Sequence, residues 1–495
     1  MASCAFITAF QNYGISLDRY LSDNNLTKLE DSPFRNLTHL FELNLAHNNI
    51  SYVATSAFSG LTKLRSLSLQ NNKLFEVPAD ALEILTSLEA LHLDSNQLQS
   101  VPSGSLKSLR RLQKLWLNGN QLREIPSQAL SRLPELEALD LGENKIQGVP
   151  DFAFKNLTKL VILMLYRNEI SYIGPYGLDG LDSLKVLEIH GNKLTEFPAA
   201  VASLPTLREL IFSDNAITEL SESAFRHNPK LTLLEMGGNP IMKVGSATFA
   251  NLPSLKKLRV SEARQMEEFP DLTGTSALEL LALDRASLRY IPSDLCDKVP
   301  LLRRLILRSN KIDKLPDLSG CKELRQIDFS YNEISSLENS PFQHQSKLID
   351  LFLGYNFIRY IPEDAFLGLQ NLQVLDLMHN HIESIHENAF MNLTKLTDLN
   401  LGENIFPTLP TEGLQNLRQL KTFNNKNLRE FPTPETFPKV HTLALSYAYH
   451  CCIFRPLARR LPLPATLQET IVWLSREDVD MEAWSTNITD VWPGY

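Results

Sequence analysis

Hydrophobic side chains follow a repeating pattern along nearly the whole chain, and one polar residue keeps its place within each repeat. The pattern reads L-x-x-L-x-L-x-x-N-x-L, as at Leu64, Leu67, Leu69, Asn72 and Leu74. The asparagine first returns every 24 residues and later slips by a residue or two. Its series is Asn24, Asn48, Asn72, Asn96, Asn120, Asn144, Asn168, Asn192, Asn215, Asn239, Asn310, Asn332, Asn356, Asn380 and Asn404. A period in this range predicts stacked coils that each add one short strand.

This pattern is the leucine-rich repeat, in which every unit supplies a strand and a returning segment. We predict an α/β leucine-rich-repeat solenoid. It is a curved horseshoe with a parallel concave sheet, and with short helices and irregular turns on the convex side. Residues 1–20 are expected to be a truncated or foreign N-terminal segment. Residues 21–445 form about 17–18 repeats, irregular near 255–290, and residues 446–495 a C-terminal cap and partial hinge region.

The repeat assigns a structural role to its polar position. The leucines fill the core, and the asparagine amide satisfies backbone groups buried between coils, each of which would otherwise cost ~1–3 kcal/mol. Two of these asparagines are missing, because Ala263 and Ala286 stand at the expected positions. We expect the curvature to change there, dividing the horseshoe into two arcs. The phenylalanine of recurring Ala-Phe-x-x-Leu strings, such as Phe154, is expected in the core.

Cysteines and glycosylation sequons favour an oxidising environment outside the cell. Cys296 and Cys321 are 25 residues apart, about one repeat, so successive coils bring them together and a disulfide is predicted. Cys451 and Cys452 are adjacent and do not bond to each other; they pair with cysteines beyond residue 495 or are free. Asn-x-Ser/Thr sequons predict glycans at Asn25, Asn36, Asn49, Asn156, Asn392 and Asn487.

Charge and motif content argue against several classes of function. The chain has 48 basic and 57 acidic residues without a basic tract, so nucleic acid is not an expected partner. No glycine-flanked nucleophile appears, and no enzymatic activity or cofactor is predicted. His379, His381 and His386 resemble a metal-binding run, but the first two flank Asn380 on opposite sides, so we expect a solvated loop and no metal site.

The strand positions between the second and third leucines of each repeat project onto the concave face. Trp116, Met164 and Ile211 place large apolar groups there, which is typical of protein interfaces. Nearby acidic residues suit a basic ligand. The alternative is a set of scattered surface hydrophobes without a partner. The predicted ligand-binding residues are Trp116, Asp140, Ile162, Met164, Tyr166, Glu188, Ile211 and Glu235.

Four strings carry a more specific resemblance. They are Phe269-Pro-Asp-Leu-Thr-Gly-Thr275, Leu283-Asp-Arg-Ala-Ser287, Leu445-Ser-Tyr-Ala-Tyr-His-Cys-Cys452 and Val479-Asp-Met-Glu-Ala-Trp484. With them, residues 20 to 490 resemble the type-B leucine-rich-repeat-containing G-protein-coupled receptors, their insect members above all. The resemblance implies a disulfide between Cys296 and Cys321. It also implies partners for Cys451 and Cys452 nearer the membrane.

The same resemblance implies a function. In this family the repeats bind a cystine-knot hormone, the bursicon heterodimer in insects, while vertebrate relatives bind R-spondins. A hinge connects them to seven membrane helices that activate a stimulatory G protein and raise cyclic AMP. The chain is therefore expected to be a truncated hormone-binding ectodomain at the cell surface. The alternatives are an R-spondin-type co-receptor and a secreted or adhesive leucine-rich-repeat protein.

Overall fold

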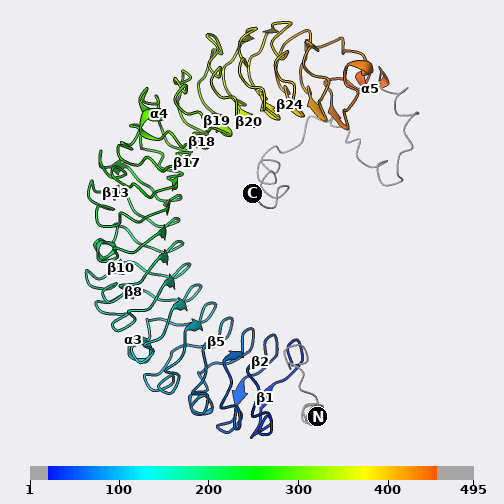
Figure 1. Ribbon diagram of the computed structural model, residues 1–495. Coiled ribbons are helices and arrows are strands. Elements are labelled where there is room, and N and C mark those ends of the chain that lie inside the picture. Colours follow the sequence, from blue (N-terminus) through cyan, green and yellow to red (C-terminus); the bar gives the residue numbers. More distant parts are fainter. Residues whose placement is uncertain (1–20, 454–495) are drawn as a thin grey trace.

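The computed structural model describes residues 21–453, which wind into one curved solenoid with its strands along the inner edge (Figure 1). Each of these strands is three residues long. They are β2 (Glu42–Asn44), β4 (Ser66–Ser68), β5 (Ala90–His92), β6 (Lys114–Trp116), β7 (Ala138–Asp140), β9 (Ile162–Met164), β11 (Val186–Glu188), β12 (Glu209–Ile211), β14 (Leu233–Glu235), β16 (Lys257–Arg259), β17 (Leu280–Ala282), β18 (Arg304–Ile306), β19 (Gln326–Asp328), β20 (Asp350–Phe352), β22 (Val374–Asp376), β24 (Asp398–Asn400), β25 (Gln419–Lys421) and β26 (Thr442–Ala444).

The concave strands pair in parallel and in the order of the sequence, from β2 to β26. Equivalent residues of successive repeats face each other, as in the pair of Leu115 with Leu139. The central residue of each strand points into the core, whereas its two neighbours point into the concavity. The predicted leucine-rich-repeat solenoid is confirmed.

The returning segments contain little regular structure. Their single helical turns are α2 (Ala79–Leu82), α3 (Ser127–Leu130), η2 (Ala199–Ser203), α4 (Leu295–Lys298) and η3 (Pro434–Thr436), and α5 (His450–Ile453) follows the last strand. Two-stranded parallel pairs join β1 (Lys28–Leu29) to β3 (Tyr52–Val53), β8 (Gly148–Val149) to β10 (Tyr172–Ile173), β13 (Glu219–Leu220) to β15 (Lys243–Val244), and β21 (Tyr360–Ile361) to β23 (Ser384–Ile385). The predicted phenylalanine plugs, such as Phe154, are fully buried.

The asparagine ladder forms as the pattern predicts. Asn72 is representative: its Oδ1 accepts from the Ile50 amide at 2.9 Å, and its Nδ2 donates to the Leu45 and Leu69 carbonyls at 3.0 and 3.1 Å. Each rung therefore links its own coil to the preceding one. At the first position of the series, Asn24 is exposed and its Nδ2 donates to the Ser22 carbonyl at 2.9 Å.

The sequence pattern missed one rung near the C-terminal end. Asn425 is buried and its Nδ2 donates to the carbonyls of Leu401 at 2.9 Å and Thr422 at 2.7 Å. Its Oδ1 has no hydrogen-bond partner. The pattern appeared to decay here because Thr422 stands at the third leucine position of the frame, whereas the fold keeps the coil in step with its neighbours.

The two missing rungs leave the sheet intact. Ala263 is fully buried, and β14, β16, β17 and β18 stay paired across the gap. In place of the rungs, Ser287 Oγ donates to the Arg264 carbonyl at 2.7 Å and Ser261 Oγ to Asp284 at 2.6 Å. The first bond satisfies a backbone carbonyl, and the second joins two side chains on adjacent coils.

A disulfide joins Cys296 of α4 to Cys321, with 4.9 Å between the Cα atoms, which confirms the predicted pair. It lies one coil beyond the interrupted ladder. Cys451 is an exposed free thiol. The segments 1–20 and 454–495, with Asn487, lie outside the described residues, as does the side chain of Cys452.

Candidate functional site

The predicted ligand-binding residues lie on the strands from β6 to β14, except Tyr166, which follows β9 by two residues. We call this set the N-terminal patch: Trp116, Asp140, Ile162, Met164, Tyr166, Glu188, Ile211 and Glu235. The sequence suggested side chains that stand in water, but each is half-buried by its neighbours on adjacent strands, and Asp140 is only 8% exposed. Strands about 4.8 Å apart bring such side chains into contact along each column.

Trp116 is held by a neighbour that sequence reasoning did not select. The His92 ring stacks on the indole with 4.1 Å between ring centroids and 5° between planes. His92 occupies the same column one repeat earlier, on β5. That 24-residue offset is the signal that could have identified it. The stack fixes the indole before any partner arrives, which lowers the entropy cost of binding.

Tyr166 reaches back across one coil toward Asp140. Its hydroxyl lies 3.5 Å from Asp140 Oδ2, while the Gly142 amide donates to Oδ1 at 2.8 Å. The tyrosine ring covers Gly142, where an added Cβ would be 2.5 Å from a ring carbon, so this position requires glycine. His190 stacks beside the ring at 5.2 Å. Gly142 and His190 were not predicted as site residues.

Burial controls the electrostatics of the patch. Burial, together with the smaller effect of the charges of Asp94 and Glu188, raises the pKa of Asp140 to about 6, although the bond from the Gly142 amide acts in the opposite direction. Burial also raises the pKa of Tyr166 to about 12, with Asp140 adding to the effect. A cation brought close would favour the ionised Asp140. The structure thus places an electrostatically unsatisfied carboxylate at the centre of an aromatic surface.

The predicted patch residues differ in how available their side chains are to a ligand. Glu235 lies 3.1 Å from Arg259 of the next strand, so its charge is already compensated. Trp116, Asp140, Met164 and Glu188 occupy consecutive positions of one column on β6, β7, β9 and β11. The structure therefore concentrates the patch on these four strands.

Aromatic residues of the C-terminal arc are placed differently. We call Tyr331, Tyr355 and His379 the rim stack, because each precedes a ladder asparagine at the edge of the concavity. Their rings stack at 4.0 and 4.6 Å. The Arg308 guanidinium covers one end at 4.7 Å, and Glu403 bonds to His379 Nδ1 at 2.5 Å at the other. Both faces of the Tyr331 and Tyr355 rings are thus occupied, and Glu403 binds the edge of the His379 ring.

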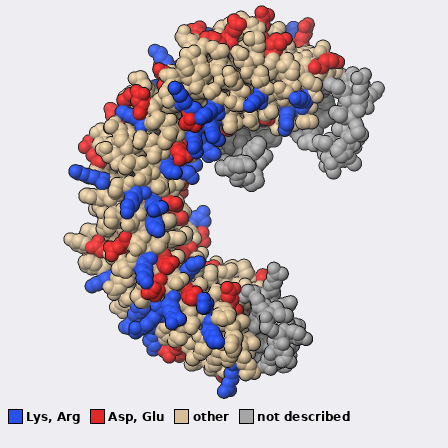
Figure 2. Space-filling view, in the orientation of Figure 1, with Lys and Arg blue, Asp and Glu red and all other residues tan. Residues whose placement is uncertain are grey.

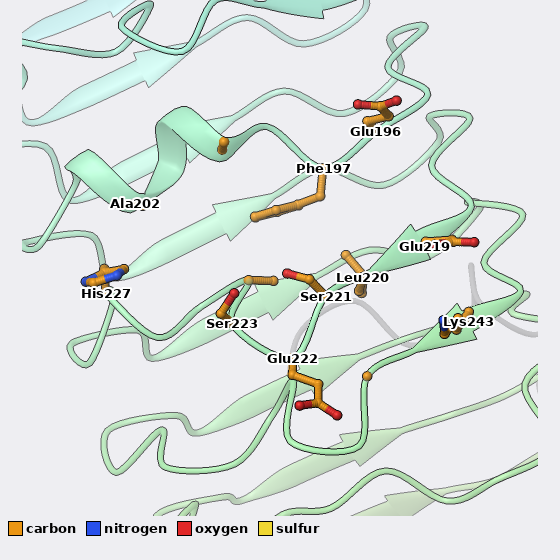
Figure 3. Close-up of a pocket in the computed structure, with 13 residues that line it drawn as sticks. Glu196, Phe197, Ala202, Glu219, Leu220, Ser221, Glu222, Ser223, His227 and Lys243 are labelled. Atoms are coloured by element: carbon orange, nitrogen blue, oxygen red, sulfur yellow. The ribbon is translucent and has the colours of Figure 1, made fainter.

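A shallow hollow of about 700 Å³ lies on the other side of the molecule, between η2 and the β13–β15 pair (Figure 3). Glu196, Glu219, Glu222 and Lys243 line it together with Phe197. None of the N-terminal patch residues borders it. The hollow is therefore a separate surface feature of the convex side.

Histidines of the metal-like run separate in the fold. His379 belongs to the rim stack, whereas His381 packs against Phe357 at 5.7 Å. Within residues 21–453, no three histidine, cysteine or acidic side chains gather closely enough to hold a metal ion. In the same range, no helix is long and apolar enough to cross a membrane.

The predicted glycosylation sites fall into two groups. Asn36, Asn156 and Asn392 each stand twelve residues after a ladder position, at equivalent points of the returning segments. The first two are exposed and the third is half-buried. In contrast, Asn49 Nδ2 donates to Asn25 Oδ1 at 2.5 Å on the adjacent coil.

Comparison with known sequences agrees with this architecture. The family described as "Leucine rich repeat" matches residues 20–74, 86–146, 134–194, 205–263, 322–382 and 370–424. Leucine-rich repeat-containing G-protein coupled receptor 5 of Xenopus tropicalis is 42% identical over 261 residues, 53% of this chain and 26% of that protein. Leucine-rich repeat-containing G-protein coupled receptor 4 of Homo sapiens is 40% identical over 261 residues, which are 53% of this chain and 25% of that protein. The chain spans about a quarter of the length of these curated relatives.

Solved structures with the same fold are more distant in sequence. A leucine-rich-repeat protein of Leptospira interrogans aligns with a TM-score of 0.64 at 23% identity, covering 88% of this chain and 97% of that one. Toll, in its complex with Spatzle from Drosophila, aligns with a TM-score of 0.61 at 18% identity, covering 89% and 59%. At these identities the likeness concerns the fold alone.

Proposed function

This chain belongs to the leucine-rich repeat family, and from that premise we propose that it is the hormone-binding extracellular region of a G-protein-coupled receptor. The chain is homologous to leucine-rich-repeat-containing G-protein-coupled receptors, at about 40% identity. That homology agrees with an extracellular ligand-binding region at the cell surface. The ligand and the signalling partner are the further content of the proposal.

The ligand we propose is a cystine-knot protein hormone, a heterodimer of the bursicon type, so that the chain corresponds to part of an insect bursicon receptor. Bound hormone would signal in the full-length receptor through the stimulatory G protein and cyclic AMP. The four strings between Phe269 and Trp484 support this choice, because they carry the resemblance to the insect receptors.

One observation supports the proposed contact site most strongly: the buried Asp140 carboxylate is paired in register with Trp116 and lies 3.5 Å from the Tyr166 hydroxyl. Aromatic anchors that surround a desolvated charge are typical of interface hot spots. A basic side chain of the hormone would pair with Asp140 while its apolar neighbours cover the rings. The arrangement suits a protein ligand, since binding would extend along several strands.

The test is the affinity of the recombinant bursicon heterodimer for the purified chain. The double variant Trp116→Ala/Tyr166→Ala should bind at least about 100-fold more weakly, as expected for two hot-spot aromatics. Phe75→Ala is the matched control, because Phe75 is 57% exposed and lies outside the concave strands. Unchanged affinity in the double variant would show that the patch is not the contact site.

The second candidate is an R-spondin-type co-receptor, which the identity with receptors 4 and 5 favours. Binding of R-spondin but not of bursicon to the same patch would select it. A cell carrying the full-length receptor separates the two further, since only the hormone receptor should raise cyclic AMP when ligand is added.

A further inference from the structure

The turns that follow the concave strands line up along one flank of the solenoid. The residue directly after each ladder asparagine lies in such a turn, and we call its place the flank position. Its amide donates to a carbonyl of the preceding coil, as from Lys73 to Ile50 at 2.9 Å. In the N-terminal arc the flank position is always polar, with Asn25, Asn49, Lys73, Gln97, Gln121, Lys145, Glu169 and Lys193. Figure 2 shows basic and acidic side chains interspersed along one face of the solenoid, which is the usual composition of a surface in water.

The flank position becomes apolar in the C-terminal arc, where Figure 1 labels β20 and β24. Phe357, His381 and Ile405 occupy it on three consecutive coils, and we call them the flank row. Phe357 and Ile405 are 50% and 40% exposed, and His381 is exposed as well. The amides of the three residues donate to the preceding coil at 2.9, 3.0 and 3.1 Å, and the His381 ring lies 5.7 Å from that of Phe357. Equivalent backbone bonds thus hold an exposed apolar row on a regular support.

Opposite charges stand at the two ends of the flank row. Glu333 occupies the flank position one coil before Phe357. Lys426 occupies it one coil after Ile405, because it follows the buried rung Asn425. Both charged side chains are exposed, and neither forms an ion pair within 4.0 Å among the residues that the structure describes. Each charge is therefore available to a partner.

The order of residues along this flank is self-complementary. His381 is in the middle, with Phe357 and Ile405 one coil away on either side, and Glu333 and Lys426 two coils away. A twofold axis that crosses the flank at His381 reverses the order of the coils in a second copy. Phe357 of one copy then meets Ile405 of the other, and Glu333 meets Lys426, each contact occurring twice. Since adjacent coils repeat at about 4.8 Å, both matches hold at once.

A second copy of the chain fits this surface better than a partner that carries charge of one sign. Such a partner would satisfy one end of the flank row and be repelled at the other. The predicted glycan sites Asn25 and Asn49 occupy the flank position at the opposite end of the solenoid, where bulky glycans would keep two copies apart. Glu383, two residues after His381, would meet its own equivalent near the axis, at an exposed margin where water screens like charges.

We propose that two copies of this chain associate side by side through the flank row, with Glu333 of each copy paired to Lys426 of the other. The contact is smaller than a standard protein interface, so we expect a dissociation constant on the order of 10 µM. None of the residues of the N-terminal patch takes part, and the association needs no ligand.

Sedimentation equilibrium of the purified full chain tests the proposal, with free thiols alkylated so that no disulfide links two copies. The parent should be mostly dimeric at about 100 µM, tenfold above the expected dissociation constant. Glu333→Lys and Lys426→Glu should each weaken association at least about tenfold, because like charges then oppose each other at two places. Lys73→Glu, at the flank position of the N-terminal arc, is the matched control and should leave the dissociation constant unchanged.

A mixture of the two charge variants is the most specific measurement. Glu333→Lys and Lys426→Glu each oppose like charges in their own dimers, yet a mixed dimer of the two contains two ion pairs. An equimolar mixture should therefore recover the parent's dissociation constant within about threefold, as should the double variant Glu333→Lys/Lys426→Glu. The variant Phe357→Ser/Ile405→Ser keeps both charges and should form no dimer at about 100 µM, because the apolar contact is lost.

Three results would overturn the inference. A parent chain that stays monomeric at about 100 µM lacks the interface. A dimer that neither charge variant weakens uses another surface. A mixture that fails to associate more strongly than its components shows that Glu333 and Lys426 do not meet. If the parent is monomeric and Phe357→Ser/Ile405→Ser lowers its affinity for the hormone, the flank row belongs to the ligand site instead of to a second copy.

Discussion

The N-terminal patch and the rim stack are built from the same kinds of side chain, yet their chemical situations are opposite. In the patch, Trp116 and Tyr166 stand on the concave columns, each with one stacked neighbour and a buried carboxylate between them. In the rim stack, Tyr355 has a ring on both faces, and Arg308 and Glu403 close the ends. Aromatic residues thus offer a surface at one position of the repeat and stabilise the fold at another.

The largest expected effect concerns a feature that both regions share. Asn168 lies beneath the patch and Asn356 beneath the rim stack, and each rung makes equivalent hydrogen bonds to two coils. Either change to alanine leaves several buried backbone groups unpaired and should cost ~3–5 kcal/mol of unfolding free energy, measured in urea. The exposed Lys145→Ala, on the turn after the Asn144 rung, is the control and should cost less than ~0.5 kcal/mol. If the two alanine variants lost very different amounts of unfolding free energy, the two arcs would differ in their cores as well as in their surfaces.

The next effect separates stability from binding within the patch. The folded pKa of Asp140, about 6, exceeds its ordinary value of 3.8, so the folded state holds the proton more tightly. The contribution of Asp140 to the free energy of unfolding should therefore be greatest below about pH 4 and be lost as the pH rises through 6. At pH 8 the free energy of unfolding of Asp140→Asn should exceed that of the parent by ~2–3 kcal/mol. At pH 4 the two proteins should have equal free energies of unfolding. The same variant should bind a basic ligand more weakly; tighter binding would contradict the assigned role.

A smaller effect is expected in the rim stack. Tyr355→Ala removes two ring contacts and should cost ~1–3 kcal/mol of stability, while Tyr355→Phe keeps the stack and should cost less. Hormone affinity should not change in either variant. If Tyr355→Ala weakened binding as strongly as Trp116→Ala, the contrast between the two regions would be wrong.

The smallest effect concerns the outer surface behind both regions. Asn156 and Asn392 stand on returning segments, so the Asn→Gln changes that remove their glycosylation sites should leave ligand affinity within about twofold, because surface substitutions away from a contact usually change free energies by less than about 0.5 kcal/mol. Asn25 and Asn49 bond to each other, and glycopeptide mass spectrometry should find no molecule with glycans on both. Full occupancy of both sites would show that this contact is not kept.

Much of the fold follows from local pattern alone. The 24-residue frame predicted the buried leucines, the ladder from Asn48 onward and the Cys296–Cys321 disulfide, because each depends only on which residues recur one coil apart. Asn425 was missed because Thr422 replaces the third leucine of its frame, and only its place between paired strands keeps it in register. The concave column was likewise predictable as a position, from alternation along a three-residue strand.

What each concave residue does was decided by its neighbours on other coils. The sequence determined that Trp116 and Tyr166 share a face, but not that His92 fixes the indole or that Gly142 lets Tyr166 reach Asp140. Nor did composition indicate that Asp140 is buried while Glu235 is paired with Arg259. Burial and pairing depend on distances between coils, which a repeat pattern leaves unstated. The sequence therefore determined the scaffold, and tertiary contacts decided which of its positions are chemically available.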